Sequence, residues 1–298
     1  MSKNLKLLSL GAGVQSTVLA LMACDGTLPG LDGAIFADTG WEPPSVYKQV
    51  DRLQAEFDKA GVPLHRVTRG NIRNDIVNAD SRFASVPWFI TNPDGSEGMG
   101  RRQCTAEYKL RPIGLKVREL LGAKPPDFRS VPRGHVAEQW IGFSTDEIHR
   151  VNDKQENLYT MKRYPLLELG MSRKDCERWL KASGWGDTAK SACIGCPFHG
   201  NAAWRDLRDN HPEQWVDAVD FDRQIRKGGA RGEALRGEAF LHRSRVPLDL
   251  APINRVTSKE WADRQMTIED ELAEFGDVDG CSPYGCRSGE PVDEKGAA

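Results

Sequence analysis

The chain has 298 residues, enough for one large domain or two modest ones with a sizeable core. Its 41 basic and 43 acidic residues nearly balance, so the overall composition carries no nucleic-acid signature, although it is compatible with a local basic face. No apolar run approaches the ~20 residues of a membrane span, and the first residues lack the charged-then-apolar order of a secretion signal. Seven cysteines without such a signal favour reduced thiols, so we expect a cytoplasmic protein without a membrane partner.

The beginning of the chain is its most informative stretch. The mostly apolar run Leu5–Leu10 leads into a glycine-bearing turn, Gly11–Gly13, and the segment Ser16–Cys24 follows. Strand, turn and helix in this order are typical of a phosphate-binding turn, because glycines let backbone N–H groups approach an anion and a helix N-terminus attracts negative charge. Ser16 and Thr17 add hydroxyl donors. An ordinary strand-to-helix connection also fits, since the turn matches neither the dinucleotide fingerprint nor the lysine-bearing P-loop.

A second segment supports phosphate binding. Gly33–Ala37 predicts a short buried strand, and Asp38-Thr39-Gly40 follows at its end. Ligands of open α/β sheets bind outside the carboxyl ends of the strands. Two consecutive strands that each end in small and polar residues therefore indicate a ligand site at this edge of the sheet.

Strands and helices alternate over the first half of the chain. We predict strands at Leu5–Leu10, Ala34–Ala37, Leu64–Val67 and Glu138–Phe143, with helices at Ser16–Cys24, Pro44–Lys59, Asn71–Asn78 and Lys109–Leu121. This alternation predicts an α/β fold with a doubly wound, mostly parallel sheet. The glycine-containing polar loop Asn92–Arg102 fits equally a mobile lid or a surface insertion.

The pattern becomes helical in the second half. Val151–Tyr159 is polar and predicted to be irregular, and Ser172 is typical of an N-cap for a helix over Arg173–Ala182. Pro212 fits the first turn of a helix that runs to about Lys227. A further helix is predicted from Thr257 or Ser258 to about Phe275, and the last residues, Gly289–Ala298, are predicted to form a frayed tail.

Five segments, in order along the chain, resemble one protein family. Gly11–Thr17 resembles the pyrophosphate loop (PP-loop) of the adenine-nucleotide alpha-hydrolase superfamily, and Ala37–Pro43 resembles the Asp-Thr-Gly segment of its phosphoadenylyl-sulfate (PAPS) reductase-like branch. Three more matches to that branch are Cys104-Thr105 with Lys109 and Pro112, the strand-to-arginine segment Ile141–Arg150, and the Pro-Leu segment Tyr164–Leu167. The resemblance covers roughly residues 5 to 200, and the ordered set is more specific than any single block.

This resemblance implies that residues 1–168 form a nucleotide-binding domain for ATP or a related adenine nucleotide, with Mg²⁺, and that residues 169–298 form a helical, cysteine-bearing C-terminal region. The residues implied to surround the nucleotide are Gly11, Ala12, Gly13, Gln15, Ser16, Thr17, Asp38, Thr39, Gly40 and Gly142. Catalytic roles are implied for Asp38 and Arg150. The family loop usually begins Ser-Gly-Gly and has an acidic residue before its serine, where this chain has Gly11, Ala12 and Gln15.

Cys193-Ile194-Gly195-Cys196 is the second strong signal, because a Cys-x-x-Cys turn brings two thiolates to one metal site. A [4Fe–4S] cluster, a zinc site that includes His199 and another cysteine, and redox or structural thiols all fit this turn. Cys24 lies on an apolar helix face and is predicted to be part of the core.

The resemblance favours the iron–sulfur cluster. Cluster-bearing members have a cysteine segment before Cys-x-x-Cys at a separation similar to that between Cys104 and Cys193. They have adjacent cysteines where this chain has only Cys104, so a fourth ligand must come from elsewhere. Cys286 is favoured over Cys281, and Cys176 is less favoured because it lies in a helical pattern. The predicted ligands are therefore Cys104, Cys193, Cys196 and Cys286.

Basic and aromatic residues leave two interpretations open. The basic residues form one set near Cys104, one after the fourth strand and one in the C-terminal half: Arg101, Arg102, Lys109 and Arg111; Arg150, Lys162 and Arg163; Arg223, Arg226, Lys227, Arg231, Arg236, Arg243 and Arg245. A solvated face balanced by acids is favoured for the last set over a phosphate track for RNA or DNA. Trp41 is a candidate to stack on bases, whereas helix packing is favoured for Trp204 and Trp215 and a structural role for His242.

The function predicted from these features is cleavage of an adenine nucleotide between its α- and β-phosphates. The acceptor, which is either a nucleobase in tRNA or DNA in a phosphorothioation-like system, would be adenylylated and then receive sulfur from a sulfur donor. Two alternatives are a sulfonucleotide reductase, which would use a C-terminal cysteine and an electron donor such as thioredoxin, and a non-catalytic nucleotide-sensing or nucleic-acid-binding protein. The match of Asp279-Gly280-Cys281 to the reductase tail, Glu-Cys-Gly, is loose. A homodimer is one possible assembly.

Overall fold

The computed structural model describes residues 2–78, 80, 86–152, 154, 157–229, 235–258 and 260–261. Its centre is a five-stranded, all-parallel sheet with the strand order β3-β2-β1-β6-β7. These strands are β1 (Asn4–Leu10), β2 (Gly33–Asp38), β3 (Leu64–Thr68), β6 (Val136–Trp140) and β7 (Thr160–Arg163). The predicted α/β class and parallel sheet are confirmed.

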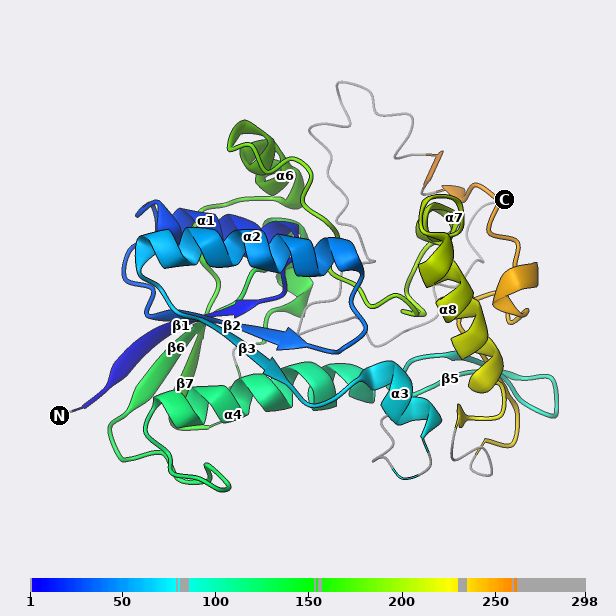
Figure 1. Ribbon diagram of the computed structural model, residues 1–298, viewed down its shortest axis with the longest axis horizontal. Helices are drawn as coiled ribbons and strands as arrows, with labels where there is room; N and C mark the ends of the chain where they lie inside the picture. Colours follow the sequence, from blue (N-terminus) through cyan, green and yellow to red (C-terminus); the bar gives the residue numbers. More distant parts are fainter. Residues whose placement is uncertain are drawn as a thin grey trace.

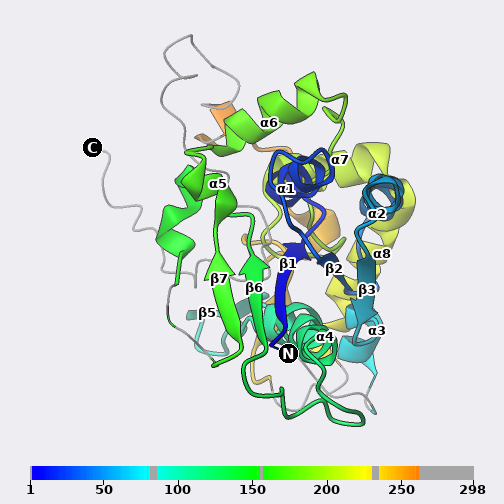
Figure 2. The same cartoon turned by 90° about the vertical axis from the view of Figure 1, so that its left-hand side faces the viewer.

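Helices cover both faces of this sheet (Figure 1). Helices α1 (Val14–Cys24) and α2 (Pro44–Ala60) lie on one face, and α4 (Arg111–Leu120) lies on the other. The alternation of side chains along β1 explains this arrangement, because Leu8 packs with the α1–α2 layer while Leu7 packs with Ile113 and Val117 of α4. Helix α6 (Arg173–Ala182) packs on α1 (Figure 2).

Strand β7 is the part of the main sheet that the sequence prediction missed. Its four residues, Thr160 to Arg163, pair in parallel with β6 at the edge of the sheet. Three of the four side chains are half-buried and Met161 is exposed. A short edge strand of this kind lacks the apolar run that made β1 and β2 visible in the sequence.

A smaller antiparallel sheet corrects the prediction for the loop Asn92–Arg102. Strand β4 (Phe89–Thr91) pairs with β5 (Glu97–Met99) as a hairpin, and β4 also pairs with β8 (Glu238–Phe240). The segment therefore supplies one of three strands, β5, of a sheet that also includes β8 from far along the chain. The predicted loop thus contains a short strand whose backbone groups pair with β4.

Helices α3 (Ile72–Val77), α7 (Asn201–Asn210) and α8 (Pro212–Gln224) gather beyond the carboxyl end of β2 (Figure 1). They share a second core that contains Trp41, Trp204 and Phe221. This core draws on residues from both sides of residue 168, including Tyr108 and Ile194. It faces the edge of the main sheet where the sequence predicts a ligand site.

Helix boundaries follow the capping residues closely. Ser172 caps α6 through a capping box with Asp175, as predicted, and Pro212 lies in the first turn of α8. The helix predicted from Lys109 instead starts with a π-helical turn, η1 (Thr105–Leu110), directly after Cys104. The remaining short elements are η2 (Thr145–Arg150), α5 (Pro165–Glu168) and η4 (Leu248–Leu250).

Several sequence predictions concern residues outside the ranges that the structure describes. Cys281, Cys286, the tail Gly289–Ala298, Arg231 and most of the helix predicted up to Phe275 lie outside the described residues. Every helix in the described part of the chain is too short or too polar to cross a membrane.

Candidate functional site

The turn between β1 and α1 places a helix N-terminus at the carboxyl edge of the sheet. Gly13 is the N-cap residue of α1 in an extended conformation, and no side chain of the described residues caps this end. Ala12 adopts a left-handed backbone with φ +56°, which favours glycine. The first amides of a helix have no intrahelical acceptor, so this end can donate hydrogen bonds to an anion.

A glutamine that the sequence analysis did not single out holds the turn. The side-chain amide of Gln49, on α2, donates to the carbonyl oxygen of Ala12 at 2.7 Å and to the hydroxyl of Thr17 at 2.9 Å. Its oxygen accepts from the N–H of Ala189 at 2.8 Å. Thr17 is fully buried, so its hydroxyl positions the turn, while Ser16 is 8 % exposed and lies nearer the surface.

The segment after β6 packs against the same helix end. A Cβ placed on Gly142 would lie 3.1 Å from the N atom of Ser16, so the backbone approaches α1 more closely here than most side chains would allow. The side-chain amide of Gln15 contacts the Ser144 hydroxyl at 3.4 Å and the Glu147 carboxylate at 3.2 Å. The predicted residues Gln15 and Gly142 are thus brought together.

Arg150 reaches this region through Glu147. The two buried side chains form an ion pair, and the guanidinium of Arg150 lies over the ring of Phe143, 5.1 Å from its centroid. Burial raises the pKa of the Glu147 carboxyl, and the nearby Arg150 acts in the opposite direction. Gln15, Glu147 and Arg150 therefore form one connected polar group beside the start of α1.

Asp38 lies at the carboxyl end of β2, beside the β1 turn in the sheet order. Its carboxylate accepts from the N–H of Gly40 at 2.7 Å and from the hydroxyl of Tyr47 at 2.8 Å. Burial and the contact with Asp38 raise the pKa of Tyr47. Gly40 has φ +72°, and a Cβ there would lie 2.8 Å from the Cα of Asn71, so this turn requires glycine.

Thr39 connects the Asp38 segment to the cysteines. Its buried hydroxyl donates to the Glu42 carboxylate at 3.0 Å and lies 3.3 Å from the sulfur of Cys193. The ammonium of Lys109 lies 3.4 Å from the same Glu42 oxygen. Lys109 belongs to the π-helical turn η1, which follows Cys104.

Three of the four predicted cluster ligands line one pocket. Cys104, Cys193 and Cys196 are on its wall together with Thr39 and Lys109. The free space among them is about 30 Å³, room for one or two water molecules. Within the described ranges, no group of three or more His, Cys, Asp or Glu side chains is placed to hold a single metal ion. The fourth predicted ligand, Cys286, lies outside these ranges.

The other described cysteines lie elsewhere. Cys176 is fully buried in the core under α1, and burial raises its pKa to about 12. Cys24 is half-buried against the same core, and burial raises its pKa to about 11. His199 contacts the carbonyl oxygen of Cys193 at 3.0 Å through Nε2 and packs edge-on against Trp204.

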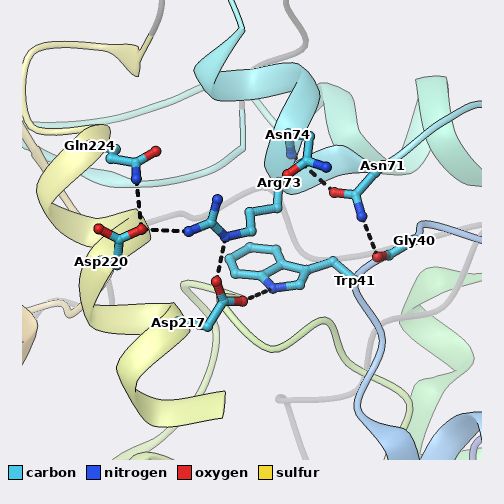
Figure 3. A network of polar contacts seen from close by, with 8 residues as sticks. All are labelled: Gly40, Trp41, Asn71, Arg73, Asn74, Asp217, Asp220 and Gln224. Carbon is cyan, nitrogen blue, oxygen red and sulfur yellow. Dashed lines mark hydrogen bonds and ion pairs between the residues drawn. The ribbon is translucent and has the colours of Figure 1, made fainter. Parts of the chain in front are cut away.

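Trp41 supports the Cys193–Cys196 turn and is not available to stack on a base. Only 6 % exposed, it packs edge-on against Phe221, and its indole N–H donates to Asp217 on α8 at 2.5 Å. Asp217 and Asp220 also bind the guanidinium of Arg73 on α3 (Figure 3). A Cβ on Gly195 would lie 2.1 Å from a ring atom of Trp41, so the turn rests directly on this ring.

Ser191 is a second residue near the β1 turn that the sequence analysis missed. Its Cβ lies 3.4 Å from the position that a Cβ on Gly13 would take. The side chain is buried, and its hydroxyl has no hydrogen-bond partner among the described residues. A short polar residue between Lys190 and Ala192 gives no sequence signal, because its importance comes from a contact across the fold.

The described basic residues of the C-terminal half are largely paired with acids. Arg223, Arg226 and Lys227 form ion pairs with Asp249, Asp222 and Glu238, and Arg245 pairs with Glu97. These pairs agree with a balanced surface. His242 is 2 % exposed and bonded to Asn201 and Ser244, which agrees with a structural role.

Comparison with known proteins adds no family assignment: no protein-family model matches this chain, and no curated protein matches it.

Proposed function

We propose that this protein is an ATP pyrophosphatase of the PP-loop type that adenylylates an acceptor for sulfur transfer, either a nucleobase in tRNA or DNA in a phosphorothioation-like reaction. One observation carries the proposal. The β1–α1 turn, the Asp38 segment and a three-cysteine pocket adjoin one another at the carboxyl edge of a parallel sheet, where Thr39 contacts Cys193.

The β1–α1 turn suits the phosphate chain of ATP. The first amides of α1 and the hydroxyl of Ser16 are hydrogen-bond donors in a region where the helix dipole favours negative charge. Gln49 fixes the turn from α2, and Gly142 allows the segment after β6 to lie against it. In this proposal Arg150 stabilises charge on the nucleotide, since it is tied to Gln15 through Glu147.

The proposed reaction has two balanced steps. An oxygen of the acceptor attacks the α-phosphorus of ATP, and the bond from that phosphorus to the bridging oxygen of the β-phosphate breaks, so pyrophosphate leaves with the bonding electrons. A sulfur nucleophile then displaces AMP, which leaves with the activated oxygen. In a nucleobase a carbon–sulfur bond replaces the carbon–oxygen bond, and in DNA a phosphorus–sulfur bond replaces a phosphorus–oxygen bond. Asp38 is the proposed contact for the nucleotide or for Mg²⁺, which would neutralise part of the phosphate charge when bound.

The cysteine pocket contains the type of side chain that binds an iron–sulfur cluster. Cys104, Cys193 and Cys196 would hold the cluster, since thiolates are the ligands that iron–sulfur clusters take in proteins. The space of about 30 Å³ is smaller than such a cluster, so the pocket would have to widen to admit it. When bound, the cluster would supply an iron site at which sulfide can be held.

Pyrophosphate formation tests the proposed activity. We expect the anaerobically purified protein, incubated with ATP and unfractionated tRNA, to release pyrophosphate and AMP, and the Ser16→Ala variant to release much less. Release of orthophosphate alone, or no turnover with tRNA or with DNA, would contradict the proposal. Reduction of PAPS to sulfite would instead support the reductase alternative.

Iron and sulfide analysis with a visible absorption spectrum tests the cluster separately. The Cys193→Ala variant is expected to lose the chromophore and the iron, whereas Cys24→Ala, at a half-buried cysteine on α1, is expected to keep both. Unchanged iron in Cys193→Ala would refute the ligand assignment.

A further inference from the structure

The carboxylate of Asp38 lies at the end of β2, on the edge of the sheet that holds the proposed nucleotide site. The residues before it in β2 are all buried, whereas Asp38 itself is half-buried. Its hydrogen bonds from the N–H of Gly40, at 2.7 Å, and from the hydroxyl of Tyr47, at 2.8 Å, both end on Oδ1. Oδ2 takes part in neither bond, so it is the oxygen that can accept from a ligand.

These two bonds fix the carboxylate before any ligand binds. Gly40 has φ +72°, and its carbonyl oxygen accepts from the side-chain amide of Asn71, the N-cap residue of α3, at 2.6 Å (Figure 3). Tyr47 reaches Asp38 from the N-terminal part of α2. Burial and the nearby carboxylate raise the pKa of Tyr47, so its hydroxyl keeps its proton and donates at neutral pH. A preorganised acceptor of this kind loses little conformational entropy on binding.

Asp38 lies level with the β1–α1 turn. Leu10 pairs with Phe36 in the parallel register, so Asp38 and Ala12 each lie two residues beyond that pair. Neighbouring strands are ~4.8 Å apart, so the carboxylate is about one strand spacing from the turn.

The space on the other side of the turn is occupied. A Cβ on Gly142, after β6, would lie 3.1 Å from the N atom of Ser16, so backbone fills the β6 side. Ser191 lies beside Gly13 and is 8 % exposed, and its hydroxyl has no partner among the described residues, as expected for a donor to a phosphate oxygen. With the phosphates at this point, the ribose that follows the α-phosphate would lie on the β2 side, near Asp38.

We infer that Asp38, held by Tyr47, accepts hydrogen bonds from the ribose hydroxyls, and that the site therefore selects an adenine nucleotide with an unphosphorylated ribose. The inference rests on the proposed function, which places the nucleotide phosphates at the β1–α1 turn. A carboxylate suits this role, because the 2′ and 3′ hydroxyls are neutral donors and hydrogen bonds to a charged acceptor are strong. In dinucleotide-binding sheets, an acidic residue about 20 positions after the phosphate-binding turn binds the ribose in this way.

A phosphate on the ribose would be rejected at this position. It would place further negative charge against Asp38, and like charges in contact cost binding free energy. ATP has no such group, whereas PAPS has a 3′-phosphate. One side chain would therefore separate the nucleotide of the proposed pyrophosphatase from that of the reductase alternative.

Calorimetry with three nucleotides that share the triphosphate tests the role of Asp38. The ligands are ATP, 2′,3′-dideoxy-ATP and 3′-phospho-ATP, each titrated with Mg²⁺ into the full-length protein. We expect ATP to bind about tenfold or more tightly than either analogue, the effect of one hydrogen bond to a charged group or of one charge repulsion. Equal affinity for ATP and the dideoxy nucleotide, or for ATP and the 3′-phosphorylated one, would overturn the inference.

Asp38→Asn keeps Oδ1 as an acceptor for Gly40 and Tyr47 but removes the charge. This variant should bind ATP more weakly and should bind the three nucleotides within about threefold of one another. Asp25→Asn is the matched control and should keep the wild-type preference. Asp25 also accepts from the N–H two residues further on, that of Thr27, at 2.9 Å, at an exposed position beyond the far end of α1.

The same variant separates a ribose contact from a role in holding Mg²⁺. If Asp38 acted through the metal ion or only through the fold, Asp38→Asn would weaken binding of all three nucleotides by the same factor. A preference for ATP that survives this substitution would overturn the inference.

Tyr47 is a positioning residue, because it acts on the ribose only through Asp38. We expect Tyr47→Phe to lower the preference for ATP over dideoxy-ATP by about threefold or more. Tyr108→Phe is the matched control and should keep the preference, since Tyr108 donates to Asp75 at 2.7 Å in the second core. Thermal melts check that all four variants fold, and an unchanged preference in Tyr47→Phe would contradict the inference.

The outcomes for the wild-type protein distinguish this inference from the proposed function. Binding of none of the three nucleotides would contradict the proposed function itself. Binding of ATP with no preference among the three would overturn only the ribose contact and leave the phosphate site standing. The expected preference without release of pyrophosphate would support the ribose contact and contradict the proposed activity.

Discussion

The hydroxyl oxygen of Thr39 lies 3.3 Å from the sulfur of Cys193. These residues are 154 positions apart in the sequence, and the contact joins the segment after β2 to the Cys-x-x-Cys turn. Glu42 contacts both residues, since its carboxylate accepts from the Thr39 hydroxyl at 3.0 Å and lies 3.7 Å from the Cys193 sulfur. The same carboxylate also contacts Lys109 of η1. Any change at the cysteine turn can therefore reach the Asp38 segment through one side chain.

Replacing Thr39 with valine keeps its shape and removes its hydroxyl. We expect Thr39→Val to lower the free energy of unfolding by about 1 to 3 kcal/mol, because the buried Glu42 carboxylate loses a donor. Thr39→Ser, which keeps the hydroxyl, should retain much of this stability. Urea unfolding of the three proteins measures the difference, and equal stability of the valine and serine variants would refute the role of the hydroxyl.

Gly195 is required by its contact with Trp41. The Gly195→Ala variant would place Cβ 2.1 Å from a ring atom that Asp217 and Phe221 hold in position. We expect a loss of about 1 to 3 kcal/mol in the free energy of unfolding, the usual cost of overpacking a core.

Gly114→Ala is the matched control for this substitution. Gly114 is in α4, and apart from its chain neighbours and the nearby backbone of its own helix no described atom lies within 4 Å of its Cβ position. This variant should gain stability, since alanine favours a helix. The assignment of the Trp41 contact would be wrong if Gly195→Ala were as stable as Gly114→Ala in thermal melts.

Ser191 offers a test in which stability and binding change in opposite directions. Ser191→Ala removes a buried hydroxyl that lacks a partner among the described residues, so we expect the free energy of unfolding to rise by up to about 1 kcal/mol. If this hydroxyl donates to a bound phosphate, the same variant should bind ATP more weakly. Calorimetry and thermal melts measure both quantities, and unchanged ATP affinity would exclude Ser191 from the site.

His242 predicts a dependence of stability on pH. Burial, with a contribution from Arg243, lowers its pKa from 6.5 to about 4. Its Nδ1 accepts from the N–H of Ser244, so Nε2 carries the proton directed to Asn201. Between pH 6.5 and about 4 the unfolded chain takes up a proton that the folded chain does not, so stability falls as the pH falls.

This single group should cost about 3 kcal/mol of stability between pH 7 and pH 4. Urea unfolding at a series of pH values measures the slope. The His242→Gln variant should show a shallower slope in this window, and a slope equal to that of the wild type would contradict the assignment.

The structural features that could be predicted from the sequence are those that depend on a local residue pattern. The apolar runs of β1 and β2, the cap at Ser172 and the polar residues after each strand are all visible within a few positions. Strand β7 was missed because an edge strand needs few apolar residues. The hairpin of β4 and β5 was missed because its partner, β8, lies far along the chain.

The supports of the candidate site were the hardest to foresee. Gln49 contacts Ala12 and Thr17 across the α1–α2 layer, and Ser191 reaches Gly13 from a loop. Neither contact has a short sequence motif, because each depends on how distant elements pack. The burial of Trp41 against Phe221 likewise follows from the second core and excludes the stacking role considered for this tryptophan.

Isothermal titration of ATP in the presence of Mg²⁺ tests the central claim most directly, that the turn at the start of α1 binds the phosphates of an adenine nucleotide. The wild-type protein should bind, and Ser16→Ala should bind about tenfold more weakly, the effect of losing one hydrogen bond to a charged group. Thr27→Ala, at an exposed threonine beyond the other end of α1, should bind like the wild type. No heat of binding in the wild type, or equal affinity in wild type and Ser16→Ala, would contradict the account.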